Sequence, residues 1–503
     1  MELRYLLEDL PDACVEGDLD IDLGQIRCDS RCVEEGDFFV AVRGGQEQDR
    51  HRFVDHAIAR GARAVMVEEK IDCAGATRVQ VADCRAALAR MAARFYAFPG
   101  QALLNVGVTG TNGKTTTAFL LRSALDAAGL PCGYLGTLGF WCDGELEKMD
   151  NTTPEAIQLQ GLLRQLVDAG KRAAVLEVSS HGLALKRVEG IPFWAAVFTN
   201  LTRDHLDFHG TWEAYFAAKA RLFECLQEGA IAVINADDTH ADELARRTKA
   251  RVVTYGCGPE AEVRLQRADA SPQGTHLCLD TPAGSIEVQT HLIGRFNYYN
   301  TMAVVATGLA LDLDAAALCR GLEALDSVPG RCERIAEGQD FAVVVDYAHT
   351  PDALERVLHA ACDLGSGRLI CVCGCGGDRD RGKRPLMARV AGELADWTVL
   401  TSDNPRSEDP QRIIDEMAAG MPDSSEVHSE VDRAQAIAMA LAAAHSGDVV
   451  VIAGKGHEQQ QELADRVVAF DDREVARRVL RDLCAGEPCG PSLGAARQPS
   501  CAP

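Results

Sequence analysis

Short apolar runs alternate with amphipathic stretches along most of the chain. Near the N-terminus, runs at residues 37–42 and 64–68 flank a helical pattern at 54–60. Further apolar runs recur at 103–109, 173–178, 195–199, 230–235, 341–345, 368–373, 397–401 and 448–453. Strands that alternate with helices predict parallel sheets covered on both faces, so we expect an α/β fold.

Two breaks divide this pattern into three predicted domains. The segment Phe98-Pro99-Gly100 ends the first block and Ser327-Val328-Pro329-Gly330 ends the second. We therefore expect a small N-terminal α/β domain at 1–98, a central parallel-sheet domain at 99–330 and a C-terminal Rossmann-like domain at 331–484. Residues 485–503 are rich in Gly, Pro and Ser, which predicts a disordered tail.

Charge and composition narrow the possible partners. A net charge of -24 argues against nucleic acid and anionic membranes, which need a basic surface. The N-terminus has acidic residues within its apolar stretch, and no run approaches the roughly 18 apolar residues of a membrane span. The 19 cysteines are scattered, as expected for reduced thiols. We predict a cytoplasmic protein that acts on small molecules.

A phosphate-binding motif follows the apolar run at 103–109. Its residues are Gly110, Thr111, Asn112, Gly113, Lys114, Thr115 and Thr116, and an amphipathic helix comes next. In such a P-loop, backbone N–H groups bind phosphate, the lysine reaches the terminal phosphates and the first Thr ligates magnesium. Val108 stands where the strict pattern has glycine. We expect a P-loop ATPase domain here; the alternative is a glycine-rich turn that binds nothing.

Polar residues follow the next two apolar runs of the same domain. Glu177 ends the run at 173–178, and His205 follows the run at 195–199. Carboxyl ends of parallel strands are where ligands bind, and a carboxylate oxygen suits Mg²⁺. Alone, Glu177 could instead cap a helix, and His205 could be an ordinary packed or surface residue.

Six segments together resemble the Mur ligase family, and the resemblance extends to about residue 484. They are GTNGKTT at 110–116, EVSSHGL at 177–183, TNLTRDHLDFHG at 199–210, GRFNYYN at 294–300, PGR at 329–331 and DYAHTPD at 346–352. The resemblance implies an ATP-dependent ligase that joins a carboxylate to an amine through an acyl phosphate. It also implies that the three domains bind a UDP-sugar, ATP and an amino acid in turn.

The resemblance assigns roles around the nucleotide. Asn297, Asn300, Arg331 and Asp346 match positions that hold ATP. Lys219 matches a lysine carried as a carbamate (N6-carboxylysine), which with His205 and Glu177 would bind the second of two Mg²⁺ ions. Lys114, Lys219 and His205 are thus the expected catalytic residues. Without the resemblance, Lys219 would be assigned to a solvated helix face.

The family match also places the UDP-sugar-peptide. The matching N-terminal positions are Cys28, Ser30, Gly45, Gln46 and Glu47, and those in the central domain are Asn151, Thr152, Thr153, Ser179, Leu185 and Arg187. Relatives often have Gln where Leu185 stands, which puts one polar contact with the substrate in doubt.

The amino-acid site is expected in the third domain, at Arg379, Asp403, Asn404, Pro405, Arg406, Gly454 and Glu458. Arginine forks suit carboxylates and Glu458 suits an ammonium group. The Asp403–Arg406 string resembles the pattern specific for meso-diaminopimelate. We therefore expect addition of meso-diaminopimelate to UDP-N-acetylmuramoyl-L-alanyl-D-glutamate by a monomer, in cytoplasmic peptidoglycan precursor synthesis. Either arginine could instead form a surface ion pair.

Several alternatives remain at this point. The added amino acid could be L-lysine, or the added group could be D-alanyl-D-alanine. Folylpolyglutamate synthase shares the chemistry but does not need a uridine-binding first domain. From a different class, the chain could be a P-loop ATPase module that forms no amide.

Overall fold

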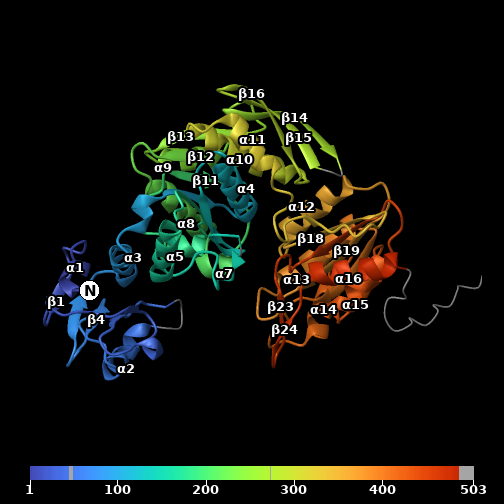
Figure 1. The fold of residues 1–503 in the computed structure, drawn as a ribbon. Coiled ribbons are helices and arrows are strands. Elements are labelled where there is room, and N and C mark those ends of the chain that lie inside the picture. Colours follow the sequence, from blue (N-terminus) through green and yellow to red (C-terminus); the bar gives the residue numbers. More distant parts are fainter. Residues whose placement is uncertain (45–48, 145, 272–273, 486–503) are drawn as a thin grey trace, which may run out of the picture. The chain divides into compact units, whose positions relative to one another are not determined.

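The computed structural model describes residues 1–44, 49–144, 146–271 and 274–485 (Figure 1). Compact unit 1 comprises Met1–Arg264, Asp280–Ile286 and Tyr299–Leu322, and unit 2 comprises Leu265–Leu279, Glu287–Tyr298 and the chain from Glu323 onward. The domain bounds expected from the sequence stay predictions. In the described chain, no helix is long and apolar enough to cross a membrane.

The N-terminal sheet has five strands in the order β1-β5-β4-β3-β2. Its strands are parallel except β1, which runs antiparallel to β5. The strands are β1 Cys14–Glu16, β2 Ile26–Arg27, β3 Phe38–Val40, β4 Ala64–Val67 and β5 Thr77–Gln80. The helices are α1 Leu3–Leu6, α2 Val54–Ala59 and α3 Cys84–Phe95, with 3-10 turns at Ser30–Cys32 and Arg50–Phe53.

The central sheet has eleven strands in the order β16-β15-β14-β13-β12-β11-β6-β10-β7-β8-β9. The strands from β14 to β7 in this order are parallel, whereas β8 and β9 are antiparallel additions that the apolar pattern did not predict. The strands are β6 Leu104–Thr109, β7 Cys132–Gly136, β8 Gly139–Trp141, β9 Leu146–Glu147, β10 Ala173–Glu177, β11 Ala195–Phe198, β12 Ile231–Asn235, β13 Arg251–Gly256, β14 Val263–Ser271, β15 Gly274–Thr281 and β16 Gly284–Thr290.

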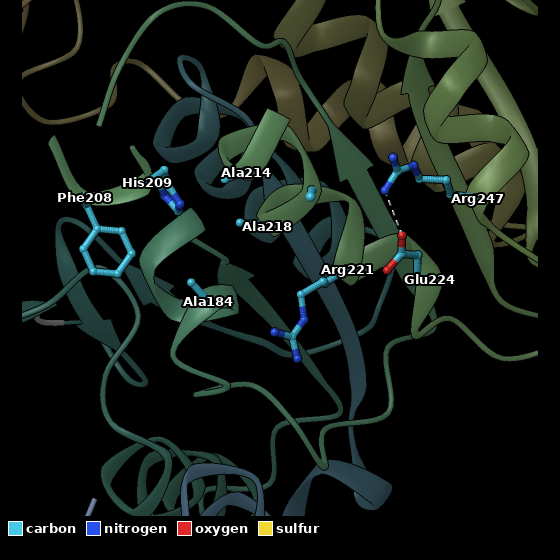
Figure 2. A pocket seen from close by; sticks show the side chains of 9 residues that line it. Ala184, Phe208, His209, Ala214, Ala218, Arg221, Glu224 and Arg247 are labelled. Atoms are coloured by element: carbon cyan, nitrogen blue, oxygen red, sulfur yellow. Dashed lines mark hydrogen bonds and ion pairs between the residues drawn. The ribbon is translucent and has the colours of Figure 1, made fainter. Parts of the chain in front are cut away.

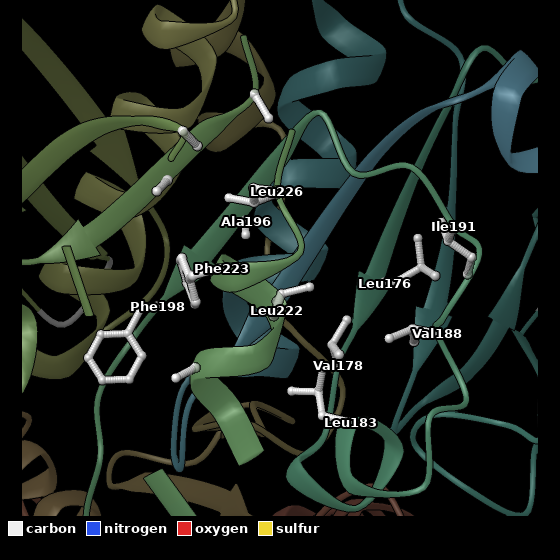
Figure 3. Packing of buried hydrophobic residues seen from close by; sticks show 14 of the residues in the cluster. Leu176, Val178, Leu183, Val188, Ile191, Ala196, Phe198, Leu222, Phe223 and Leu226 are labelled. Atoms are coloured by element: carbon white, nitrogen blue, oxygen red, sulfur yellow. The ribbon is translucent and has the colours of Figure 1, made fainter. Parts of the chain in front are cut away.

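Side chains of the central strands point alternately to the two faces of the sheet, so an apolar cluster on one face is separated from the polar Glu177 on the other. Leu176 and Phe198 pack with Leu222 and Phe223 of α8 in one apolar cluster (Figure 3). Successive strand residues point to opposite faces, so Glu177 points away from this cluster, toward α4. The helices are α4 Lys114–Ala127, α5 Ala156–Asp168, α6 Ser180–Ala184, α7 Leu206–His209, α8 Trp212–Glu224, α9 Ala241–Arg247, α10 Arg295–Ala310 and α11 Ala315–Glu323, with a 3-10 turn at Pro99–Ala102.

The C-terminal sheet has the order β17-β18-β22-β19-β20-β21 and is parallel except for β17. Its strands are β17 Glu333–Arg334, β18 Ala342–Asp346, β19 Leu369–Cys375, β20 Trp397–Ser402, β21 Glu426–Glu430 and β22 Val449–Ala453, beside the hairpin β23 Gln460–Glu462 and β24 Val467–Ala469. The helices are α12 Pro351–Cys362, α13 Lys383–Leu394, α14 Pro410–Ala418, α15 Arg433–Ala442 and α16 Asp472–Cys484. Apolar clusters cover both faces of this sheet. The predicted α/β fold class is confirmed.

Candidate active site

The loop between β6 and α4 requires glycine at two positions. Gly110 has φ +152°, and a Cβ there would lie 1.8 Å from Thr199 Oγ1. Gly113 has φ +85°, and its Cβ would lie 2.6 Å from Asn300 Oδ1. Side chains at either position would be strained and would collide with a neighbour. The backbone of this loop is therefore close-fitted to the residues after β11 and to α10.

Hydrogen bonds from the segment after β11 brace the same loop. The Asn200 carbonyl accepts from Thr111 N at 2.9 Å, and Asn200 Oδ1 accepts from Asn112 N at 3.0 Å. Thr199 Oγ1 donates to the Asn112 carbonyl at 2.6 Å. The predicted motif thus adopts one defined conformation between adjacent strands β6 and β11.

The first turn of α4 carries the remaining motif side chains. Lys114 Nζ donates to the carbonyls of Gly110 and Thr111 at 2.9 and 2.8 Å, so its ammonium lies against the loop. Thr115 and Thr116 are both buried. A cation and backbone N–H groups at the start of a 14-residue helix form a suitable site for phosphate.

Glu177, at the carboxyl end of β10, is 1% exposed and fully engaged. Its Oε2 accepts from Thr115 Oγ1 and Thr137 Oγ1, both at 3.0 Å. Its Oε1 accepts from Tyr134 OH and from Thr137 N. Thr137 Oγ1 also lies 3.1 Å from Thr152 Oγ1. Glu177 is therefore a positioned carboxylate beside the P-loop rather than a helix cap.

These oxygen atoms fit a magnesium ion. The Thr115 hydroxyl and Glu177 carboxylate already lie together, and Mg²⁺ is commonly held by one or two protein oxygens together with substrate phosphates and water. Across the described residues, no group of three or more His, Cys, Asp or Glu side chains could hold a metal alone.

Lys219 lies on α8 and is 2% exposed, so the solvated-face alternative is wrong. Its Nζ donates to the Gly110 carbonyl at 2.6 Å and lies 4.7 Å from the centre of the Tyr215 ring. Burial, reinforced by the Lys114 ammonium, lowers the pKa of Lys219 well below its ordinary value. The shift favours the neutral amine, which is the form that can react as a nucleophile.

His205 belongs to a cluster of three histidines that the sequence did not predict. Its ring centre lies 4.8 Å from that of His181, which in turn lies 5.6 Å from His209. Desolvation within the cluster lowers the pKa of His205 and that of His209, each to about 4, although the His205 side chain is 44% exposed. The ring centres of His205 and His209 lie 6.3 and 5.1 Å from that of Tyr215 on α8, and the lowered pKa values favour neutral imidazoles. No sequence motif joined His181 to His205, because they follow different strands.

The central-domain residues matched to the sugar-peptide also converge. Thr153 Oγ1 lies 3.0 Å from Ser179 Oγ, and Ser179 caps α6 by accepting from Gly182 N. Arg187 Nη1 donates to the Thr153 carbonyl at 2.8 Å. Asn151 is exposed, and Leu185 is half-buried at the end of α6.

The N-terminal residues matched to uridine lie in the turn after β2. The Cys28 carbonyl accepts from Arg50 Nη1 at 3.0 Å, and Ser30 Oγ lies 3.0 Å from His56 Nδ1. Burial raises the pKa of the Cys28 thiol to about 12, so it is a neutral neighbour. The other three predicted residues, Gly45, Gln46 and Glu47, lie outside the described residues.

A hollow of about 480 Å³ lies beside α8, outside the predicted site residues. Figure 2 shows Phe208 and His209 on one side of it and Glu224, paired with Arg247, on another. Ala184, Ala214, Ala217, Ala218 and Arg221 complete its lining.

The remaining residues matched to ATP contact both backbone groups and side chains. Asn297 Nδ2 donates to the Ile293 carbonyl, and Asn300 Oδ1 accepts from Thr117 Oγ1 of α4 at 3.1 Å. In unit 2, the Arg331 guanidinium lies 4.7 Å from the centre of the Tyr347 ring. The Asp346 carboxylate accepts from Cys332 N and Ala348 N, each at 2.7 Å, and burial raises its pKa.

The residues matched to the amino acid gather at the carboxyl ends of β20 and β22. Arg406 has φ +51°, and its side chain donates to Glu462 Oε2 at 2.7 Å and to the Gly377 carbonyl at 2.9 Å. Pro405 packs against Gly377, and Gly454 against the Asp403 carboxylate. Asn404 Nδ2 donates to Glu458 Oε2 at 2.9 Å.

Arg379 differs from these residues because it is exposed. Among the described residues it makes no hydrogen bond or ion pair, so the surface-ion-pair alternative does not describe it. Arg406 does form an ion pair, with Glu462, and this pair fixes the position of the Arg406 side chain in its loop.

Two family descriptions match the chain. "Mur ligase middle domain" matches residues 108–308, and "Mur ligase, glutamate ligase domain" matches residues 330–456. They cover the central sheet with its P-loop and most of the C-terminal sheet.

Similar proteins cover nearly the whole chain. A UDP-N-acetylmuramoyl-L-alanyl-D-glutamate--2,6-diaminopimelate ligase from Geobacter sulfurreducens is 42% identical over 97% of this chain and 100% of its own length. The protein of the same name from Gloeobacter violaceus is 47% identical, over 92% of this chain and 94% of its own. A solved structure of a ligase of that name has TM-score 0.69 and 36% identity, covering 96% and 99% of the two chains. The chain therefore belongs to the Mur ligase family.

Proposed function

We propose that the protein adds meso-2,6-diaminopimelate to UDP-N-acetylmuramoyl-L-alanyl-D-glutamate with ATP, as a step of peptidoglycan precursor synthesis. That it is a ligase follows from its family, and the relatives described above carry the name of this reaction. The proposal concerns the substrates, the residues that contact them, the magnesium ions and the monomeric state.

The fixed guanidinium of Arg406 is the observation that carries the choice of amino acid. Two of its nitrogens are committed to Glu462 and to the Gly377 carbonyl, so the fork has one orientation. Among the described residues, Nη2 makes no hydrogen bond, which leaves donors for a ligand carboxylate. Meso-diaminopimelate has a second amino-acid head group with a carboxylate, whereas lysine has only an amine at that end.

The chemistry has two steps. The acceptor carboxylate attacks the γ-phosphorus of ATP, giving an acyl phosphate and ADP, and the incoming amine then attacks the acyl carbon and expels phosphate. The first step brings the carboxylate and the phosphate together, and both are anions. Lys114, which lies against the P-loop, is placed to reduce the repulsion between them. Asp346 and Arg331 are assigned to ATP on their match to the family motifs.

Thr115 and Glu177 would hold one Mg²⁺, and Lys219, carried as a carbamate, would hold a second with His205 and Glu177. Magnesium would supply positive charge that screens the phosphate oxygens. The burial of Lys219 and the lowered pKa of its amine support carbamate formation, because only an unprotonated amine adds to carbon dioxide.

The deciding experiment measures ADP and the mass of the nucleotide product. Purified protein receives magnesium, ATP and UDP-N-acetylmuramoyl-L-alanyl-D-glutamate, with meso-diaminopimelate or L-lysine in parallel reactions. We expect a UDP-linked tripeptide with diaminopimelate alone. Tripeptide formed with lysine would contradict the amino-acid assignment, and phosphate release without any amide would favour the ATPase alternative.

A variant tests the role of Arg406 directly. Arg406→Ala should raise the KM for diaminopimelate by about 10- to 100-fold, the loss expected when a charged hydrogen bond is removed. Nucleotide binding should stay near the wild-type value, because Arg406 follows β20 of the C-terminal sheet whereas the P-loop follows β6 of the central sheet. Equal losses for both ligands would refute the assignment.

A further inference from the structure

Lys455 carries a fully buried ammonium in the loop that follows β22. Its side chain is 0% exposed, and its Nζ donates to Asn404 Oδ1 at 2.9 Å and to Glu458 Oε2 at 2.8 Å. Neither contact is with backbone, so the buried charge is satisfied by two side chains from the proposed amino-acid site. Among the described residues, these two side chains are the only hydrogen-bond partners of Lys455 Nζ, so the ammonium restricts how they are oriented.

The ammonium determines which way the Asn404 amide points. A lysine ammonium can only donate, so the atom facing it must be the amide oxygen. Asn404 Oδ1 also accepts from Glu462 N at 3.0 Å, and the amide nitrogen is thereby directed to Glu458 Oε2. Asn404 thus joins the loop after β20 to the β23 strand that carries the Arg406 partner.

The same contacts leave Glu458 with one oxygen for a ligand. Its Oε2 accepts from both Lys455 and Asn404. Among the described residues, Oε1 accepts no hydrogen bond, and the side chain is 31% exposed. An incoming ammonium group can therefore approach Oε1 while the protein holds Oε2.

We propose that Lys455 is a positioning residue for the amino-acid substrate, and that it acts by orienting Asn404 and holding Glu458 Oε2. The inference rests on the proposed function, since it takes these two side chains to be the recognition groups. It predicts that loss of Lys455 affects the binding of the amino acid more than it affects turnover.

The test compares steady-state constants of the full-length wild type and Lys455→Met for all three substrates. We expect the KM for diaminopimelate to rise about 10- to 100-fold, as for loss of charged hydrogen bonds. The KM values for ATP and the UDP-substrate should change by no more than about twofold, because neither ligand is assigned to these side chains. Lys455→Gln, which keeps a donor without the charge, should give an intermediate KM and serves if Lys455→Met does not fold.

A double-variant comparison separates positioning from general weakening. If Lys455 acts partly through Glu458, then adding Lys455→Met to Glu458→Ala should raise the KM by much less than the product of the two single effects. Arg368→Met is the matched control, because Arg368 pairs with the 5%-exposed Asp448 at the opposite, amino ends of β19 and β22. That control should lower thermal stability without changing the KM for diaminopimelate.

Three outcomes would overturn the inference: equal rises in all three KM values, multiplicative effects in the double variant, or an unchanged KM for the amino acid. If the wild type uses lysine instead, the proposed function fails on its own. The same variants are then compared with lysine, so the two failures are distinguishable.

Discussion

The buried ion pair between Arg433 and Asp472 provides the sharpest test of the energetics of the C-terminal sheet. Both side chains are 0% exposed, and Arg433 donates from Nε and Nη2 to the two carboxylate oxygens at 2.7 Å each. Its remaining donors reach the carbonyls of Ser402 and Ala453, the last residues of β20 and β22. Burial alone would lower the pKa of Arg433, but the Asp472 carboxylate raises it above its ordinary value. The arginine therefore stays charged.

Asp472→Asn removes the counter-charge but keeps the shape. The guanidinium would then be a buried cation whose hydrogen bonds go to carbonyls and a neutral amide, and Asp403 would be the nearby carboxylate that remains. Breaking one side of a buried pair costs about 3 to 5 kcal/mol, which at about 1.4 kcal/mol per tenfold is a change of roughly two to three and a half orders of magnitude in the folding equilibrium.

Hydrogen exchange during a urea titration is the suitable assay, because a chain with two compact units does not guarantee a single unfolding transition. Peptides from β20 and β22 report the local free energy of opening, and peptides from β6 and β10 serve as the internal control. A loss below about 1 kcal/mol at β20 and β22 would refute the reasoning. Replacing both partners, as Arg433→Met with Asp472→Leu, should recover most of the loss, since the uncompensated charge is then gone.

Other predictions concern the nucleotide site and acid stability. Gly110→Ala should weaken ATP binding by about tenfold or more in a titration, because its Cβ would collide with Thr199; unchanged affinity would contradict this. Lys219→Arg should reduce tripeptide formation by about 100-fold or more, because a guanidinium cannot lose its proton to form a carbamate; an active variant would exclude the carbamate. Hydrogen bonds from Arg384 lower the pKa of Glu408 from 4.5 to about 2. Its stabilising contribution is thus complete above about pH 4.5 and is lost as the pH falls toward 2, so the melting temperatures of wild type and Glu408→Gln should converge over that range.

The parts of the fold that carry a local signal were predictable. Buried parallel strands are nearly continuous apolar runs, so β6, β10 and β22 stood out, and each is followed by a motif at its carboxyl end. The short strands β8 and β9 have too few residues for a periodic pattern. They form because β8 pairs antiparallel with β7 and β9 pairs antiparallel with β8, which is a tertiary effect.

The site was predictable only where a side chain belongs to a motif. Lys114 and Glu177 were identified in this way. Thr137 links Glu177 to Thr152 from a turn without any pattern, and the pairing of Arg433 with Asp472 joins residues 39 positions apart. The burial of Lys455 was equally hidden, because the sequence cannot say that both of its acceptors are side chains, brought together by the loops that follow β20 and β22.

The Thr137 hydroxyl gives one direction to the hydrogen bonds that link Thr152 to Glu177. A hydroxyl has one hydrogen, and Thr137 donates it to Glu177 Oε2, so Thr152 must be the donor to Thr137. The carboxylate thereby orders a chain of hydroxyls in which Thr152 can accept a hydrogen bond from an N–H group but has no hydrogen left to donate to a carbonyl. A ligand that makes Thr152 accept from Thr137 instead of donating to it would take the Thr137 hydrogen bond away from Glu177. A cation bound to Glu177 would affect the same chain from its other end. A ligand bound at Thr152 must then change the affinity of Glu177 for a cation, and the cation must change the affinity of Thr152 for that ligand by the same factor.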